Sequence, residues 1–312
     1  VKDAYTIGDD SSFKFNPEPD RLSGYRTKSM LTIPLISESG KKMGVFQIIN
    51  ALDDNNNVVE FTKQMEHYMN VFATFATQAL IRAARTRAQI MRQIAMAEMR
   101  DPKETGAHVQ RVSSFAIEIY DYYASKNNIS EIEREEFRDN LKIAAILHDV
   151  GKVGIPDEVL HHPGRFVGEF EWMRKIINTH VALGAMLFYP PQDKLDQMCL
   201  DVNLHHHAKW DGTGYPGALD MKKIDASDAE TMLHGKSLSG QNIPLAARIV
   251  AMCDVYDALS HKRSYKEAWA EDKVLKVIQE ESALHFDPEI VYCFFEVIDR
   301  IRAINKQYPE EN

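Results

Sequence analysis

The sequence predicts a multi-domain protein in which a small α+β part, a long helix and an all-α helical bundle follow one another. Two short β-branched runs, residues 29–36 and 43–50, stand near the start of the chain. Residues 61–99 contain neither glycine nor proline and repeat apolar residues at helical intervals. Beyond residue 101, amphipathic stretches continue without the alternation of strands. We therefore expect an antiparallel sheet, a linking helix and a bundle, in that order.

The two apolar runs predict adjacent strands in the first part of the chain. SMLTIPLI (29–36) and MGVFQIIN (43–50) are separated by the polar segment SESGKK, which is typical of a turn between paired strands. Residues 53–57 (DDNNN) supply further turn material. The first part is therefore expected to be α+β in character.

One long helix, or two abutting helices, is expected between residue 61 and about residue 99. It carries four arginines, at positions 82, 85, 87 and 92, which are typical of a membrane or nucleic-acid surface or simply of a solvated helix face. We favour a solvated or dimer-forming linker helix.

A new helix start is expected at Asp101-Pro102, because Asp is a frequent N-cap and Pro is favoured at the first helical position. This start sets the predicted domain boundary. The helices expected after it cover residues 108–126, 131–147, 170–188, 193–207, 243–260, 271–283 and 288–306.

Composition limits the possible function classes. The chain has 312 residues and a net charge of −9, which argues against a protein that grips long nucleic acid through a basic surface. It has no apolar run long enough to span a bilayer, and its three scattered cysteines are expected to be small core residues in a reducing compartment. We therefore expect a cytoplasmic protein. Eleven of the twelve histidines lie after residue 100, so chemistry is expected there.

His148 and Asp149 stand at the end of the apolar run LKIAAIL (141–147), which predicts a core helix. A buried carboxylate is normally paired, hydrogen-bonded or bound to a metal. The pair is therefore either a hydrogen-bonded cap of that helix or part of a metal site. Other residues with metal-binding side chains favour the second interpretation, because they lie on separate predicted helices that could converge. They are Glu104, His108, His180, His206, His207 and Asp254.

Residues 101–312 resemble an HD-GYP domain, a branch of the HD metal-dependent phosphohydrolases. The motifs that carry the resemblance occur in order along the chain. They are ETGAHVQRV (104–112), HDVGKVGIPD (148–157), HPG (162–164), the His180 helix, HHAKWDGTGYPG (206–217), IPLAARIVAMCDVYDALS (243–260), RSYK (263–266) and HFDP (285–288).

The resemblance implies a two-metal core in which Asp149 bridges the ions. The other implied ligands are His148, His180, His206, His207 and Asp254. Glu104 and His108 match positions that hold a third ion in some members, although Glu104 also fits a structural capping box. Eight candidate ligands exceed the four of a tetrahedral zinc site. Two or three divalent ions are therefore expected, and a mixed imidazole and carboxylate shell suits iron or manganese.

The resemblance also implies the reaction, which is attack of a metal-bridged hydroxide on a phosphodiester. Lys152 is expected to contact the phosphate as a catalytic residue, and Arg263 and Lys266 to bind it further. Tyr215 would stack on a base or merely pack. The implied substrate is cyclic di-GMP, opened to pGpG and in some members cut on to GMP, in bacterial second-messenger signalling. The alternatives are another cyclic dinucleotide or nucleotide, or a non-catalytic dinucleotide-binding scaffold.

The remaining histidines are expected to be structural or solvated. His205 is a neighbour of the site, His285 a turn residue, and His161, His162, His234 and His261 are expected in solvent. The polar stretch 218–242, with Asp220, Asp225, Asp228 and Glu230, is either a mobile lid or a tolerated surface loop.

GYRTKSMLTIPL (24–35) and GVFQIIN (44–50), with the helix after them, resemble the C-terminal portion of a GAF sensor domain. This resemblance gives three predicted parts: a partial GAF-like domain over residues 1–85, a linker helix over 86–100 and the HD-GYP domain over 101–312. It also implies a homodimer through the linker helix.

Overall fold

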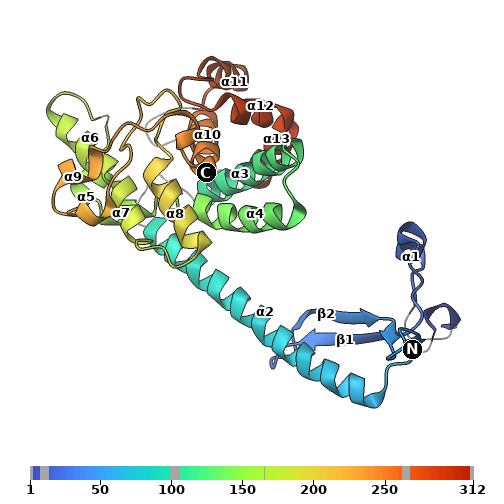
Figure 1. The fold of residues 1–312 in the computed structure, drawn as a ribbon. Coiled ribbons are helices and arrows are strands. Elements are labelled where there is room, and N and C mark those ends of the chain that lie inside the picture. The colour runs from blue at the N-terminus through green and yellow to red at the C-terminus, as the bar shows by residue number, and fades with distance from the viewer. Residues whose placement is uncertain (1–2, 8–13, 99–105, 165, 262–267, 310–312) are drawn as a thin grey trace. The chain divides into compact units, whose positions relative to one another are not determined.

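A computed structural model describes residues 3–7, 14–98, 106–164, 166–261 and 268–309 (Figure 1). The chain divides into two compact units, Val1–Met91 and Arg92–Asn312. The division falls inside the predicted linker of residues 86–100. None of the described helices is long and apolar enough to cross a membrane.

The N-terminal unit is built on an antiparallel hairpin. Strands β1 (Met30–Ile36) and β2 (Lys42–Ile49) pair with Leu35 opposite Gly44, so the two predicted strands are confirmed. A second, very short pair was not predicted and flanks the 53–57 turn; it consists of β3 (Ala51–Leu52) and β4 (Val58–Val59). Two short helices precede the hairpin, namely η1 (Ala4–Thr6) and α1 (Glu18–Ser23).

Helix α2 (Lys63–Glu98) is one continuous helix of 36 residues. Its first half covers the hairpin, because Ala73 is buried together with Ile33 and Leu35. This core is small, and α2 also leaves large apolar side chains exposed. They are Tyr68, Val71, Phe72, Phe75 and Leu80.

The C-terminal unit is helical, as predicted. Its long helices are α3 (Gly106–Lys126), α4 (Glu131–Ile146), α6 (Glu171–Asn178), α7 (His180–Met186), α8 (Lys194–His205), α10 (Leu245–Ser260), α11 (Glu271–Glu280), α12 (Pro288–Glu296) and α13 (Ile298–Gln307). Short helices η2 (Val150–Gly154), α5 (Asp157–Leu160), η3 (Gly168–Phe170), η4 (Met221–Lys223), α9 (Ala229–Leu233) and η5 (Gly240–Asn242) fill the connections.

Local sequence signals explain where several helices begin. Ser130 caps α4 by accepting from the Glu133 amide while its own hydroxyl donates to the Glu133 carboxylate. Asp193 caps α8, and Asp287 caps α12 with Pro288 at the first helical position. The central core forms where α3 packs against α4, α10, α12 and α13 (Figure 1). The three cysteines are buried and free, as predicted.

Two predicted helices are corrected by the structure. The stretch 170–188 is divided near Thr179 into α6 and α7, and 288–306 is divided at Val297 into α12 and α13. Apolar residues recur on both sides of each break, so periodicity alone does not mark it. The helix predicted over 131–147 is α4, which ends at Ile146 with Leu147 as its C-cap, so His148 and Asp149 follow it as predicted. The expected helix start at Asp101 lies outside the described residues.

Stretch 218–242 is neither an open loop nor purely polar. Met232 is buried, Leu219 and Met221 pack against Leu200 and Leu204, and Glu230 forms a 2.9 Å ion pair with Lys175 of α6. The segment is therefore packed onto α6, α7 and α8. This favours a structural insertion over a lid that moves freely.

Two glycines allow three helices that follow the His148-Asp149 turn to pack closely. A Cβ on Gly151 of η2 would lie 1.9 Å from the carbonyl oxygen of His180. A Cβ on Gly184 of α7 would lie 2.0 Å from Oδ1 of Asn203 on α8. These close approaches hold η2, α7 and α8 at a spacing that only glycine permits.

Gly151→Ala is expected to lower the free energy of unfolding by about 2 kcal/mol or more, because the added methyl group overlaps backbone atoms that cannot rotate away. Gly154→Ala is the matched control in the same short helix, since its methyl group meets only the end of the Leu183 side chain at 3.0 Å. Urea denaturation measures both. Equal loss of stability in the two variants would contradict this account of the packing.

Candidate metal centre

The described residues contain two groups of side chains whose donor atoms lie within 4.8 Å of one another. The first group is Asp149, His180, His206 and His207, and the second is His108, His148 and Asp254. Every described residue that the sequence predicted as a metal ligand belongs to one of them. The structure thus brings together residues that are separated by up to 146 positions along the chain.

Three of these histidines are oriented by the ends of helices. His148 and His206 follow the last turns of α4 and α8, and His180 follows α6. In each, Nδ1 lies close to a backbone carbonyl of the last helical turn, three or four residues earlier. The distances are 2.8 Å to Ala145, 2.7 Å to Ile177 and 2.9 Å to Val202. A carbonyl can only accept, so Nδ1 carries the proton and Nε2 is the ring nitrogen left for the site.

The Nε2 atoms of the first group face a carboxylate and one another. Nε2 of His180 lies 3.0 Å from Oδ1 of Asp149 and 3.4 Å from Nε2 of His206, which is itself 3.5 Å from that oxygen. Oδ1 is buried and accepts no hydrogen bond from any residue the structure describes. When both rings are neutral, only lone pairs meet here. Such an arrangement fits a bound cation, which would satisfy all three atoms.

Asp149 directs its two oxygens towards different neighbours. Oδ1 faces the first group, while Oδ2 lies 3.4 Å from Nε2 of His148 in the second group and 2.9 Å from Nζ of Lys152. Burial would raise the pKa of Asp149, but Lys152, His148 and His180 hold that pKa well below its usual value. The carboxylate is therefore ionised and lies between the two groups.

His206 and His207 are neutral at physiological pH. Burial lowers the pKa of both rings, that of His207 strongly, and nearby histidines lower the pKa of His207 further. A neutral imidazole is the form that binds a metal ion. The fold therefore presents these two side chains in the state that ligation requires.

The second group lies between α3 and α10. Nε2 of His108 is 3.6 Å from Oδ1 of Asp254, and the rings of His108 and His148 have centroids 5.6 Å apart. The resemblance assigns His108 to a third ion with Glu104, whereas the structure groups it with His148 and Asp254. Glu104 lies outside the described residues, as do Arg263 and Lys266.

Residues 212–216, here called the GYP loop, lie against the first group. Gly212 adopts φ +87°, and a Cβ on Gly214 would lie 2.4 Å from the carbonyl oxygen of His207, so the backbone requires glycine at both positions. Tyr215 packs on His207 with ring centroids 5.0 Å apart and planes at 26°. Tyr215 was expected either to stack on a base or to pack within the protein. The described contacts show it packing on His207.

Sequence reasoning missed Arg111 and Asp257, which are almost completely buried beside His108. Oδ2 of Asp257 lies 2.8 Å from Nδ1 of His108, and Arg111 forms a two-pronged ion pair with the same carboxylate. Helical spacing could have revealed them, because Arg111 is three residues after His108 and Asp257 three residues after Asp254.

Two histidines expected in solvent are not simply solvated. His261 lies 3.1 Å from Oδ1 of Asp257, and the ring of His162 packs against Phe166 and Phe170. His205 is buried beside the first group, as expected. His285 is a turn residue, as predicted: its carbonyl accepts from the Trp210 amide at 3.0 Å.

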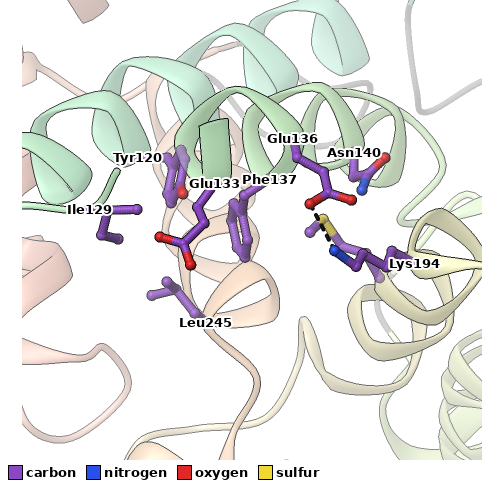
Figure 2. A pocket seen from close by; sticks show the side chains of 9 residues that line it. Tyr120, Ile129, Glu133, Glu136, Phe137, Asn140, Lys194 and Leu245 are labelled. Carbon is purple, nitrogen blue, oxygen red and sulfur yellow. Dashed lines mark hydrogen bonds and ion pairs between the residues drawn. The ribbon is translucent and has the colours of Figure 1, made fainter. Parts of the chain in front are cut away.

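A separate surface hollow of about 450 Å³ lies over α3, α4 and α8 and contains none of the candidate ligands. Figure 2 shows its lining, in which a 2.8 Å ion pair joins Lys194 to Glu136 beside the apolar side chains of Phe137 and Leu245. The hollow is therefore distinct from the candidate metal centre.

Comparison with family models gives two matches, both described as HD domain. One covers residues 105–259 and the other covers residues 234–290. All described candidate ligands lie within the first range.

Among known proteins, the chain is 33% identical over 250 residues to a 3′3′-cGAMP-specific phosphodiesterase 2 of Vibrio cholerae, covering 80% of this chain and 42% of that protein. It is 35% identical over 263 residues to a cyclic di-GMP phosphodiesterase of the same organism, covering 83% and 48%. A cyclic di-GMP phosphodiesterase of Thermotoga maritima is 29% identical over 218 residues, covering 70% and 50%. The chain thus spans half or less of the length of these relatives.

The partly buried turn histidine His285 is expected to make stability depend on pH. Burial lowers its pKa to about 4, whereas an unfolded histidine takes up a proton near pH 6.5. The unfolded state therefore binds more protons as pH falls through about 6.5, and stability decreases. Between about pH 7.5 and 5.5, His285→Gln should remove on the order of 1 kcal/mol of this decrease, measured by urea denaturation with a chelator present. An unchanged pH dependence in the variant would contradict the assignment.

Proposed function

Residues 105–290 belong to the HD domain family, and from that premise we propose that the chain is a metal-dependent phosphodiesterase that opens cyclic di-GMP to linear pGpG, which a second cut would convert to GMP. The observation that carries the proposal is the position of Asp149, with one oxygen towards each of two groups of histidines and aspartates. Several similar proteins with 29–35% identity are cyclic di-GMP phosphodiesterases.

Each group would hold one divalent ion, with Asp149 shared between them. His180, His206 and His207 complete the first site, and His108, His148 and Asp254 the second. A third ion on Glu104 and His108 would have to share His108 with the second site. The mixed donor set suits iron or manganese. When bound, such ions lower the pKa of water and neutralise charge that develops on phosphoryl oxygens.

The protein's own residues orient these groups and bind the substrate. The helix-end carbonyls fix the ring orientation of three histidines, so the donor atoms converge before any ligand arrives. Lys152 is held 2.9 Å from Asp149 at the edge of the site, and we propose that its ammonium group contacts a phosphate oxygen of the substrate. Tyr215 would pack His207 in place and border the base. Arg263 and Lys266 would add phosphate contacts.

A second candidate substrate is 3′3′-cGAMP, because proteins specific for it are as similar to this chain as those for cyclic di-GMP. The two substrates differ in one base only. Both would use the same groups of metal ligands, so the choice between them depends on contacts with the base.

We further propose that the N-terminal unit is the C-terminal portion of a GAF domain and that α2 is a linker helix that pairs in a homodimer. The exposed apolar side chains of α2 recur at helical spacing, and Tyr68, Phe72 and Phe75 are each more than half exposed. We place the protein in the cytoplasm, since its three described cysteines are free and buried.

Anaerobically prepared protein loaded with iron or manganese is expected to convert cyclic di-GMP to pGpG. Chromatography measures the product. Asp149→Ala should lower kcat/KM at least about 100-fold, because both proposed sites lose a ligand. His234→Ala is the control, as His234 is exposed and lies outside both groups. If the protein hydrolyses 3′3′-cGAMP and leaves cyclic di-GMP intact, cyclic di-GMP is wrong as the substrate and 3′3′-cGAMP takes its place. Binding of metal and dinucleotide without product would favour the non-catalytic scaffold.

Light scattering is expected to show a dimer for the wild-type chain and a monomer for Phe75→Glu, because a charge would then stand in the apolar stripe of α2. Lys63→Glu, at the start of the same helix, should leave the dimer intact. A monomeric wild-type chain at micromolar concentration would contradict the proposed homodimer.

A further inference from the structure

We infer that Asp257 is a positioning residue for the second metal group, which holds His108 so that Nε2 points towards Asp254 and His148. The inference rests on the proposed function, because it concerns one of the two proposed sites. It adds a role for Asp257 and for the buried Arg111 that orients it.

His108 needs an orienting partner different from those of the other histidines. His148, His180 and His206 follow helix ends, where carbonyls of the last turn accept from Nδ1. His108 lies near the N-terminal end of the described part of α3, and the spare backbone groups at a helix start are N–H donors. A backbone N–H group cannot accept a hydrogen bond from Nδ1 of the ring. Asp257 supplies the acceptor instead, with Oδ2 2.8 Å from Nδ1.

The carboxylate of Asp257 is itself fixed on several sides. Arg111 donates from Nε to Oδ1 at 2.5 Å and from Nη2 to Oδ2 at 2.9 Å, which sets the plane of the carboxylate. Nδ1 of His261 lies 3.1 Å from Oδ1. Nη1 of Arg111 donates to the carbonyl of Tyr308 at 2.9 Å, beyond the end of α13. The orientation of His108 thus depends on a rigid network.

Two helices each contribute a pair of residues to this arrangement. His108 and Arg111 are three residues apart on α3, and Asp254 and Asp257 are three residues apart on α10, so each pair shares a helix face. Helix α3 packs against α10 (Figure 1). The contacts among the four side chains lie across this interface. Asp254 then faces Nε2 of His108 while Asp257 faces Nδ1. The same ring lies between a proposed metal ligand and its positioning carboxylate.

The network could serve either to stabilise the fold or to position His108 for a metal ion. A buried Arg–Asp pair costs desolvation and stabilises a fold only weakly compared with apolar side chains of similar volume. The hydrogen bond to Nδ1, by contrast, fixes the ring tautomer and makes Nε2 a better donor to a metal. Metal binding therefore separates the two roles.

The test is titration of metal-free protein with Mn(II), with stoichiometry and affinity from calorimetry. Wild-type protein should bind two ions. Asp257→Asn should bind one ion as the wild type does and the other about 10- to 100-fold more weakly. His108→Ala should weaken the same ion. The matched control is Asp287→Asn, which changes another buried aspartate that is paired with an arginine, Arg248, and belongs to neither metal group; it should bind both ions within about threefold of the wild type.

The outcomes distinguish the inference from the proposed function. If Asp257→Asn binds both ions like the wild type, the positioning role is wrong and the proposed function stands. If Asp257→Asn weakens both ions equally, or Asp287→Asn weakens binding as much as Asp257→Asn does, the network is only structural and the inference fails. If the wild type binds no Mn(II), the proposed function and the inference fail together.

A measurement on wild-type protein covers the case in which Asp257→Asn does not fold. In zinc-loaded protein labelled with ¹⁵N-histidine, nuclear magnetic resonance should place the proton of the His108 ring on Nδ1, with the signal identified by its loss in His108→Ala. A proton on Nε2 would overturn the inference, because that nitrogen would then be unable to bind the ion.

Discussion

The structure depends on a single constraint, which is that the buried, ionised carboxylate of Asp149 is placed against histidine nitrogens that have no proton to offer. Helix-end carbonyls already hold the Nδ1 protons of His148, His180 and His206. Lys152 compensates part of the negative charge. The rest of the arrangement calls for cations, since an uncompensated buried charge is costly. The helical unit is organised to keep these donors in place, down to glycine contacts that leave no room for a methyl group.

Much of the fold could be predicted from sequence because local signals mark it. The two strands, the long helix and the helix starts at Ser130 and Asp287 follow from periodicity and capping residues. Interior helix breaks could not be placed where apolar residues recur on both sides of them, as at Thr179 and Val297. The register there is decided by tertiary contacts, which a one-dimensional pattern does not contain.

The residues of the candidate site could be predicted from the sequence, but the two groups that they form could not. Ordered motifs pointed to the histidines and aspartates, whereas the placement of His108 beside His148 and Asp254 depends on how α3 packs on α10. Arg111 and Asp257 were missed for a related reason. Charged residues on helices are usually solvated, so their complete burial becomes visible only when α3, α10 and the chain after α13 are seen together.

The members of the second group lie far apart along the chain. Metal binding there would therefore affect the stability of the folded protein. His108 belongs to α3 and Asp254 to α10, so an ion between them would act as a cross-link across most of the helical unit. A ligand that binds only the folded state raises stability in proportion to the logarithm of its concentration. The supply of metal in the cell would then set how long each copy resists unfolding and degradation, as well as how fast it works.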